Sequence, residues 1–350
     1  MSSAVATKHI RRNSKFKVIT LAKQVFSLRG ITIILLISFA VLMATKSAYY
    51  MDSTRKGLHL YAVAVLPSLF PFYFCSLMLT KIGAANILSK LFEAPMKKLY
   101  HTPKESAYIM FLSVLSGYPV GASCTKELYD SCALSSEDAK TIAAFASTSG
   151  PIFMLGTVGS AIFNNVYVGI IIAISHYIAA FLNGFIYRKR KKPCELSQEK
   201  ASIQNTRTDE CHIDSILSES VSKSTLSMLT LGGYIVLAGL VVDTLSLIGL
   251  DTLFFTVLGS AAQPFVALVF GFVEMTRGCI ECSKCNFKPL GVAMATAIIS
   301  FGGLSVMFQN YSFLSKCKMK FSEVLTRKIT QSLIAFALAI IFALILKKFL

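Results

Sequence analysis

The sequence Leu115-Ser116-Gly117-Tyr118-Pro119-Val120-Gly121-Ala122 interrupts an apolar segment of the chain. Pro119 lacks an amide hydrogen and disfavours helical geometry at Tyr118, while Gly117 and Gly121 tolerate backbone conformations that other residues resist. We therefore expect a helix to stop within this stretch. A helix that stops inside lipid leaves backbone groups without partners, so such a break belongs in a cavity lined by protein.

The rest of the chain has the composition of a membrane protein. Of its 350 residues, 54% are hydrophobic and 15% are charged, and the mean hydropathy is +0.62. This is too little charge to cover two soluble domains. The continuous apolar runs, each close to the roughly 20 residues that span a bilayer, are residues 31–45, 59–80, 165–187, 226–249, 252–273 and 329–346. We predict an all-α, polytopic helical membrane protein.

Basic residues give the chain a formal net charge of +17, and they gather between the apolar runs. Residues 1–30 are basic and contain no acid, which predicts a cytoplasmic N-terminal segment before a first transmembrane helix at 31–50. The segment is long for a cleavable signal peptide, the alternative interpretation, so we expect it to be retained. A later basic cluster favours a cytoplasmic loop before the last helix, whereas Lys347 and Lys348 after that helix favour a cytoplasmic tail. Both cannot hold if one helix crosses between them, so the orientation of the C-terminus stays open. The cluster comprises Lys316, Lys318, Lys320, Arg327 and Lys328. Lipid is the expected partner, and nucleic acid is not.

A second interruption follows at Ser147-Thr148-Ser149-Gly150-Pro151. Hydroxyl residues, glycine and then proline predict a helix start with Pro151 at the first helical position. We expect the backbone amides at Ser149-Gly150-Pro151 to favour an oxygen-rich or anionic group. Ordinary capping at a turn is the alternative.

The second part of the chain repeats this plan. Interruptions at 272–279 and 300–305 correspond to those at 116–121 and 147–151, and each second interruption is followed by an apolar span. We predict a first membrane repeat at 58–188, a polar cytoplasmic linker at 189–223 and a second repeat at 224–350. The loop charges favour repeats that run in opposite senses, as in carriers with broken or re-entrant helices around a site at the midplane.

Six short motifs resemble the YlbJ family of sporulation integral membrane proteins, over about residues 31–346. They are Leu66-Pro67-Ser68-Leu69-Phe70-Pro71-Phe72, Ser116-Gly117-Tyr118-Pro119-Val120-Gly121-Ala122, Thr148-Ser149-Gly150-Pro151, His176-Tyr177, Glu274-Met275-Thr276-Arg277-Gly278-Cys279 and Ser300-Phe301-Gly302-Gly303-Leu304-Ser305-Val306. The resemblance implies a nucleoside-recognition (Gate) domain in each repeat, a bacterial cytoplasmic membrane location and a role in endospore cortex formation. It does not imply a substrate, because the fold does not fix the cargo. Met307-Phe308-Gln309 departs from the polar stretch expected there.

Ionisable residues at these interruptions are candidates for function. Glu274 and Arg277 share a helical face, either as a mutual ion pair or with Glu274 as partner of a cation or proton. His176 lies within a span beside Asn183, for hydrogen bonding between helices or for proton relay. The candidate solute-binding residues are Ser116, Gly117, Tyr118, Pro119, Gly121, Thr148, Ser149, Gly150, Pro151, His176, Glu274, Thr276, Arg277, Gly302, Gly303 and Ser305.

Enzyme signatures are absent from the sequence, so no catalytic residue is expected. Cys279, Cys282 and Cys285 lack an evident fourth ligand, and we expect no metal and no cofactor. The leading hypothesis is transport or recognition of a small nucleoside-like or ionic solute. The alternative is a scaffold that does not transport and recruits cortex-assembly partners through the linker. A homo-oligomer or sporulation membrane proteins are further expected partners.

Overall fold

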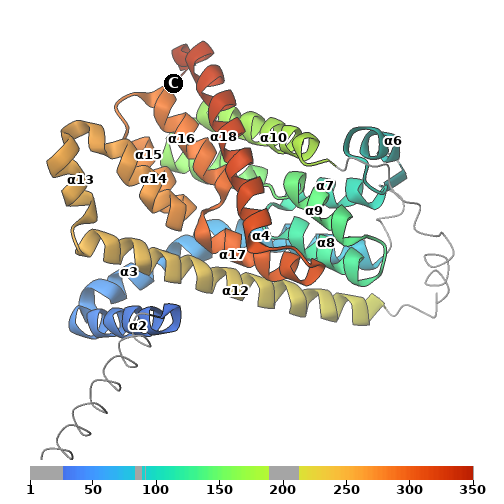
Figure 1. Cartoon of the computed structure of the whole chain (residues 1–350), viewed down its shortest axis with the longest axis horizontal. Coiled ribbons are helices and arrows are strands. Elements are labelled where there is room, and N and C mark those ends of the chain that lie inside the picture. Colours follow the sequence, from blue (N-terminus) through green and yellow to red (C-terminus); the bar gives the residue numbers. More distant parts are fainter. Residues whose placement is uncertain (1–26, 83–88, 91, 189–212, 350) are drawn as a thin grey trace, which may run out of the picture. The chain divides into compact units, whose positions relative to one another are not determined.

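The computed structural model describes residues 27–82, 89, 90, 92–188 and 213–349, and none of these residues forms a strand. The first group of helices is α2 (Leu28–Thr45), α3 (Ser47–Leu60), η1 (Tyr61–Val65), α4 (Leu66–Lys81), α6 (Glu93–Pro95), η2 (Met96–Tyr100), α7 (Glu105–Ser116), α8 (Val120–Asp130), α9 (Ser136–Phe145), η3 (Phe153–Ile162) and α10 (Val166–Ile186) (Figure 1). The second group is α12 (Ile213–Leu247), α13 (Leu250–Leu258), η4 (Gly259–Ala262), α14 (Gln263–Val273), α15 (Met275–Ser283), α16 (Lys288–Phe301), α17 (Gly303–Leu314), η5 (Ser315–Cys317), α18 (Phe321–Ile345) and η6 (Lys347–Phe349). The predicted all-α class is confirmed.

Five helical segments of the described chain are long and apolar enough to cross a membrane. They are Val166–Ile186, Ile213–Leu247, Leu250–Val273, Lys288–Cys317 and Phe321–Ile345, and the bent helix pair Arg29–Thr45 and Ser47–Val63 is a sixth if it counts as one span. The chain is therefore a multi-pass membrane protein, as predicted.

The chain divides into two compact units, residues 1–53 and 54–350. In the first unit, α2 begins after Ser27, whose hydroxyl accepts a hydrogen bond from the Gly30 amide at 3.1 Å. It ends at Thr45, because Lys46 leaves helical geometry. The helix expected at 31–50 is thus interrupted at Lys46. Residues 1–26 lie outside the described residues, so the cytoplasmic N-terminus remains a prediction.

The second unit contains two series of helices in the same order. α4 is followed by the broken pairs α7–α8 and α9–η3 and then by α10, and α12 is followed, after α13, by the broken pairs α14–α15 and α16–α17 and then by α18. This order agrees with the proposed repeats, whereas their opposite sense remains a prediction.

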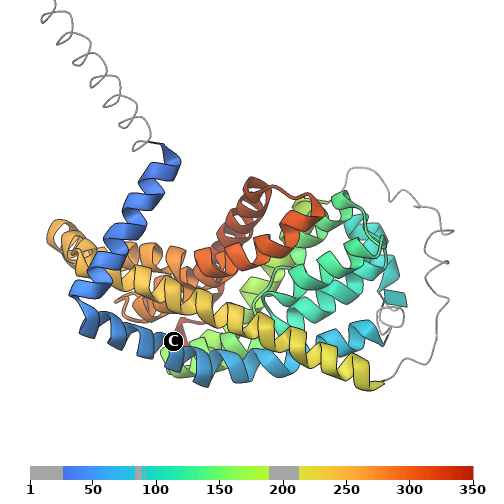
Figure 2. The same cartoon turned by 90° about the horizontal axis from the view of Figure 1, so that it is seen from below.

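The terminal helices of the two series pack together around α16. α10, α16 and α18 contact one another pairwise, and α16 is buried from Gly291 to Phe301. Its small residues allow this close approach, as in other membrane helix interfaces. On another side of the unit, α12 lies along α4 (Figure 2). There the Tyr61 hydroxyl donates to the Met228 carbonyl at 2.8 Å. The Tyr61 ring packs against Gly232, where a Cβ would lie 2.9 Å from the ring.

The polar linker ends earlier than we predicted. α12 begins at Ile213, whereas the linker was expected to reach residue 223, and residues 189–212 lie outside the described part. The first turns of α12 bury Ile216, Ser220, Ser224 and Met228 at four-residue spacing. The serines in these turns are typical of a linker, so the composition predicted one. In the structure, Ser220 and Ser224 instead belong to the buried face of α12.

Candidate functional site

The first interruption separates α7 from α8 at the predicted position. α7 ends at Ser116, Gly117 adopts φ of 78°, and α8 begins at Val120. A Cβ added to Gly121 would lie 1.9 Å from the Ala146 carbonyl oxygen, so only glycine lets α8 approach the end of α9 this closely.

The second interruption follows α9 and lies against the first. The helix restarts at Pro151, as predicted, and continues into η3. The Ser113 hydroxyl donates to the Ala146 carbonyl at 2.8 Å, and the Thr148 hydroxyl donates to the Ser113 carbonyl at 2.7 Å. These buried bonds satisfy polar groups that the broken helices would otherwise leave without partners.

The third and fourth interruptions also lie against each other. Glu274 is extended between α14 and α15, and its carboxylate accepts a hydrogen bond from the Arg277 amide at 2.7 Å. Gly302 and Gly303 both have positive φ between α16 and α17. A Cβ on Gly303 would lie 3.1 Å from the Met275 nitrogen, which shows how closely the two backbones approach.

All four interruptions contribute to one pocket. Its lining residues are Val65, Leu69, Tyr118, Ser149, Gly150, Phe153, Leu231, Ile235, Glu274, Met275, Thr276, Ser305 and Val306. Three helices, η3, α15 and α17, point their N-terminal turns at it. The cavity volume is about 30 Å³, enough for a water molecule or a small ion. Of the residues predicted for the site, Tyr118, Ser149, Gly150, Glu274, Thr276 and Ser305 line this pocket.

Comparison with known proteins finds a similarity over most of the chain. The chain is 26% identical over 306 residues to the sporulation integral membrane protein YlbJ of Bacillus subtilis (strain 168), and the match covers 81% of this chain and 75% of that protein. The match confirms the YlbJ-type resemblance. No family model matches the chain, so the Gate assignment of the repeats remains a prediction. No solved structure matches it either.

Most of the other predicted residues support the pocket from outside. Gly117 packs on Gly150, and the Gly302 backbone approaches the Tyr118 ring. The Ser116 hydroxyl shares a hydrogen bond with that of Ser76 at 2.9 Å. The remaining supporting residues are Pro119, Gly121, Thr148, Pro151 and Gly303, none of which lines the pocket.

The expected row of free amide donors at residues 149–151 needs correction. The Ser149 amide donates to Nε2 of His176 at 2.9 Å, so it is already engaged. Pro151 has no amide hydrogen and cannot donate. Among the described residues, the Gly150 amide is the one of the three that could donate and has no hydrogen-bond acceptor. His176 also contacts the second repeat, because its Nδ1 lies 2.8 Å from the Ser300 hydroxyl. Asn183 has a structural role and donates to the carbonyls of Ala144 and Arg327.

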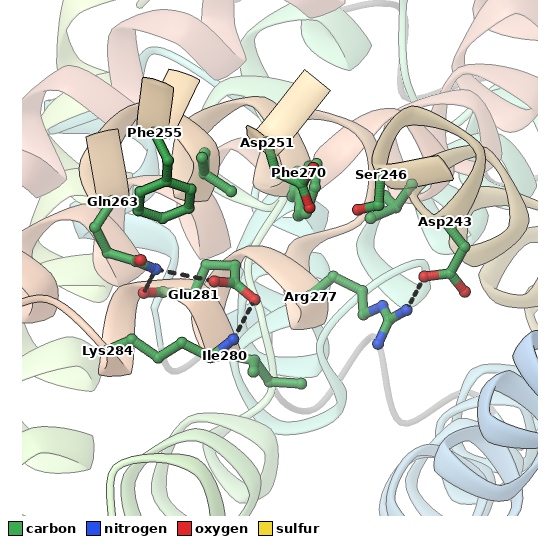
Figure 3. Close-up of a pocket in the computed structure, with 12 residues that line it drawn as sticks. Asp243, Ser246, Asp251, Phe255, Gln263, Phe270, Arg277, Ile280, Glu281 and Lys284 are labelled. Carbon is green, nitrogen blue, oxygen red and sulfur yellow. Dashed lines mark hydrogen bonds and ion pairs between the residues drawn. The ribbon is translucent and has the colours of Figure 1, made fainter. Parts of the chain in front are cut away.

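Arg277 belongs to a different pocket, which Figure 3 shows. Its guanidinium pairs with Asp243 of α12 instead of with Glu274. At the other end of this pocket, Glu281 accepts hydrogen bonds from Gln263 at 2.9 Å and from Lys284 at 2.6 Å. The pocket has a volume of about 280 Å³. Of the interpretations of Glu274 and Arg277, the mutual ion pair is therefore wrong, because only the Arg277 backbone bonds to that carboxylate.

Lys328 is the residue that sequence reasoning misplaced. We assigned it to a basic loop, but it lies on α18 with only 3% of its surface exposed. Its ammonium donates to the Tyr118 hydroxyl at 2.8 Å, the Ser147 carbonyl at 2.7 Å and the Ser300 carbonyl at 3.2 Å. Among the described residues it forms no ion pair. A periodic signal was present in the sequence, since Lys328 shares the buried face of α18 with Gln331, Ala335, Ala339 and Ala343.

Carbonyl oxygens at two helix ends stabilise the Lys328 ammonium in place of a carboxylate. Ser147 follows the end of α9, and Ser300 lies in the last turn of α16. The C-terminal ends of helices carry partial negative charge and carbonyls without intrahelical partners. The ammonium thus donates to three oxygens within 3.2 Å and lies 3.4 Å from a fourth, the side-chain oxygen of Gln331. It also lies 4.4 Å from the centre of the Tyr118 ring. Lys328 therefore links the second interruption, through Ser147, and the fourth, through Ser300, to the first, through Tyr118.

Proposed function

We propose that this YlbJ-type chain is a carrier of the bacterial cell membrane that acts in endospore cortex formation. Its solute is small and bears an anionic group, which binds where the four interruptions meet. The similarity to a sporulation integral membrane protein supports the sporulation role. Support for solute binding comes from the shared pocket of interruptions that lie far apart in sequence.

The N-terminal turn of α17 is the strongest argument for a ligand. The Ser305 hydroxyl lines the pocket, is 4% exposed and has no hydrogen-bond partner among the described residues. A buried hydroxyl without a partner is unfavourable by about 1–3 kcal/mol. A ligand oxygen at this position would satisfy it, and helix N-termini favour anionic groups.

Charge around the pocket supports an anion over a cation. The Glu274 carboxylate is already bound by the first turn of α15, so it offsets the partial positive charge of that helix end. The first turns of η3 and α17 receive no such carboxylate from the described residues. Lys328, when protonated, adds a positive charge behind Tyr118. An anionic group would balance it.

The size of the cavity implies motion. About 30 Å³ is far below the 300–1,000 Å³ of typical small-molecule pockets. We therefore propose that this conformation is closed and that one repeat moves against the other to admit the solute. Such motion would alternate access between the two membrane faces.

Uptake into liposomes tests the proposal. The purified chain is reconstituted, and uptake of labelled inorganic phosphate, succinate and uridine is measured for wild type, Ser305→Ala and Ser312→Ala. Ser312 lies on the same helix outside the pocket and bonds the Gln309 carbonyl, so it is a matched control. We expect uptake of at least one anion, lowered about tenfold by Ser305→Ala, which corresponds to about 1.4 kcal/mol. Absence of uptake of every probe by wild type would overturn the proposal.

Spore formation separates the carrier from the scaffold alternative. Ser305→Ala is compared with deletion of residues 195–210, which lie outside the described residues and before α12. The carrier proposal expects fewer heat-resistant spores from the pocket variant and normal numbers from the deletion. The reverse pattern would support a scaffold that acts through its linker.

A further inference from the structure

His176 lies between the second interruption, at Ser149, and the fourth, at Ser300. Its Nε2 accepts a hydrogen bond from the Ser149 amide at 2.9 Å, and its Nδ1 lies 2.8 Å from the Ser300 hydroxyl. The side chain has no exposed surface. Ser149 lines the central pocket, so His176 connects directly to the residues that would hold the solute.

The donor at Ser149 determines the tautomer of the ring. A backbone N–H can only donate, so Nε2 must be the unprotonated nitrogen that accepts. The neutral imidazole then carries its hydrogen on Nδ1 and donates it to the Ser300 hydroxyl oxygen. In this closed conformation both ring nitrogens are satisfied only when His176 is neutral.

We propose that His176 is the proton-coupling residue of the carrier, and that its protonation releases the Ser149 amide into the pocket. A proton added to Nε2 would place two donors, the ring N–H and the Ser149 amide N–H, opposite each other, and the hydrogen bond would break. The freed amide lies just before Pro151, where the helix that becomes η3 begins, and it would be available to an anionic group of the solute. This inference rests on the proposed function and names its coupling ion.

The surroundings of His176 link proton binding to anion binding. α18 contributes the Lys328 ammonium, the connection between α7 and α8 contributes the Tyr118 phenol, and Tyr177 contacts the ring edge at 5.5 Å between centroids. Among the described residues, no other charged group acts on the ring. Repulsion from Lys328 acts against a second positive charge in the empty pocket, whereas a bound anion offsets both charges.

Linkage makes this relationship reciprocal. Binding of the anionic solute would draw one proton from the aqueous phase onto Nε2, and protonation would in turn increase the affinity for the anion. Solute and proton would then cross the membrane together. Once the solute leaves, the ring would lose that proton and accept the Ser149 amide again.

Hydrogen exchange tests the switch without any solute. The chain in lipid nanodiscs is studied by nitrogen NMR of labelled histidine rings and by exchange of the Ser149 amide. The titration runs from about pH 8 down to the lowest pH at which the protein stays folded, because Lys328 disfavours a charged ring when no anion is bound. His176→Gln is the control, because its amide oxygen can accept from Ser149 but gains no charge. In wild type we expect an Nδ1–H ring at high pH and about tenfold faster Ser149 exchange, corrected for pH, once the ring is protonated. The control should show no such change.

Two results would overturn the inference. In one, Ser149 stays equally protected while the ring is protonated. In the other, the ring remains neutral at every pH at which the protein is folded, including in the presence of an anion that binds.

Proton counting then separates this inference from the proposed function. Binding of succinate or phosphate is measured calorimetrically in two buffers with different ionisation enthalpies. We expect about one proton taken up per anion by wild type. His176→Gln should take up no proton and should bind the anion more weakly, because its side-chain oxygen keeps the Ser149 amide engaged. Anion binding by wild type without proton uptake would contradict the role of His176 and leave the carrier proposal intact. Absence of binding to every probe would count against the carrier proposal, while the exchange experiment still decides the switch.

Discussion

Gly117 packs so closely on Gly150 that a Cβ added to Gly117 would lie 2.4 Å from the Gly150 amide nitrogen. The atom that it would meet belongs to the backbone, so no side-chain rotation can relieve the contact. The positive φ of Gly117 disfavours any other residue as well. The first two interruptions are therefore held together backbone to backbone.

Gly117→Ala should destabilise the protein strongly. Strain at positive φ and overpacking each cost about 1–3 kcal/mol, so we expect a loss of about 2–6 kcal/mol in the free energy of unfolding. Unfolding in detergent measures it. Gly156→Ala is the control, because a Cβ there would meet nothing within 4 Å. Equal stability of the two variants would contradict the close packing.

Lys328→Met should also destabilise the protein, although it replaces a charge by an apolar side chain inside a membrane protein. The change leaves the Ser147 carbonyl without its donor and the Ser300 carbonyl with only the longer bond from the Tyr118 hydroxyl. A buried group without a partner costs about 1–3 kcal/mol. Lys316 is exposed, so Lys316→Met should have little effect. A Lys328→Met protein as stable as wild type would show that these carbonyls find other partners.

Local sequence signals were sufficient to place the interruptions. Proline and glycine act on the backbone of their own turn, so the ends of α7 and α16 and the start at Pro151 could be predicted. Lys328 could not be placed in this way. Its partners Tyr118 and Ser147 are 210 and 181 residues away in sequence. The neighbouring basic residue Arg327 made the segment resemble a charged loop. Only the period of the buried face of α18 distinguishes it from the exposed lysines nearby.

The side-chain direction at Arg277 was unpredictable for a similar reason. Helical spacing from Glu274 indicated a shared face, but Glu274 precedes the helix and is extended. Its carboxylate therefore turns back to the first amides of α15. The guanidinium instead reaches Asp243 on α12, 34 residues earlier.

Asp243→Asn should reduce stability only slightly. The Arg277 side chain is 33% exposed, and water screens such pairs, so we expect a loss of at most about 1 kcal/mol. The loss should shrink further at high salt. Unfolding at low and high ionic strength measures both effects, with Asp251→Asn in the same pocket as the control. A loss of several kcal/mol that salt does not change would mean that the pair is far less hydrated than its exposure indicates.

Glu274→Gln separates two roles for the one carboxylate that lines the central pocket. The side chain is 2% exposed, and it accepts from the first turn of α15. A glutamine oxygen can still accept that bond, but the negative charge at the helix N-terminus is lost. We therefore expect the variant to be less stable by about 1 kcal/mol and the first amides of α15 to exchange faster.

Anion affinity of the same variant gives the decisive comparison. If Glu274 acts only as the cap of α15, removing its charge removes repulsion and should strengthen binding of succinate or phosphate several-fold. If Glu274 instead holds a cation or proton that accompanies the solute, as its sequence position led us to predict, anion binding should weaken. Glu281→Gln removes a carboxylate from the separate Arg277 pocket and should leave affinity unchanged. A parallel change in both variants would point to the overall charge of the protein and against either local role.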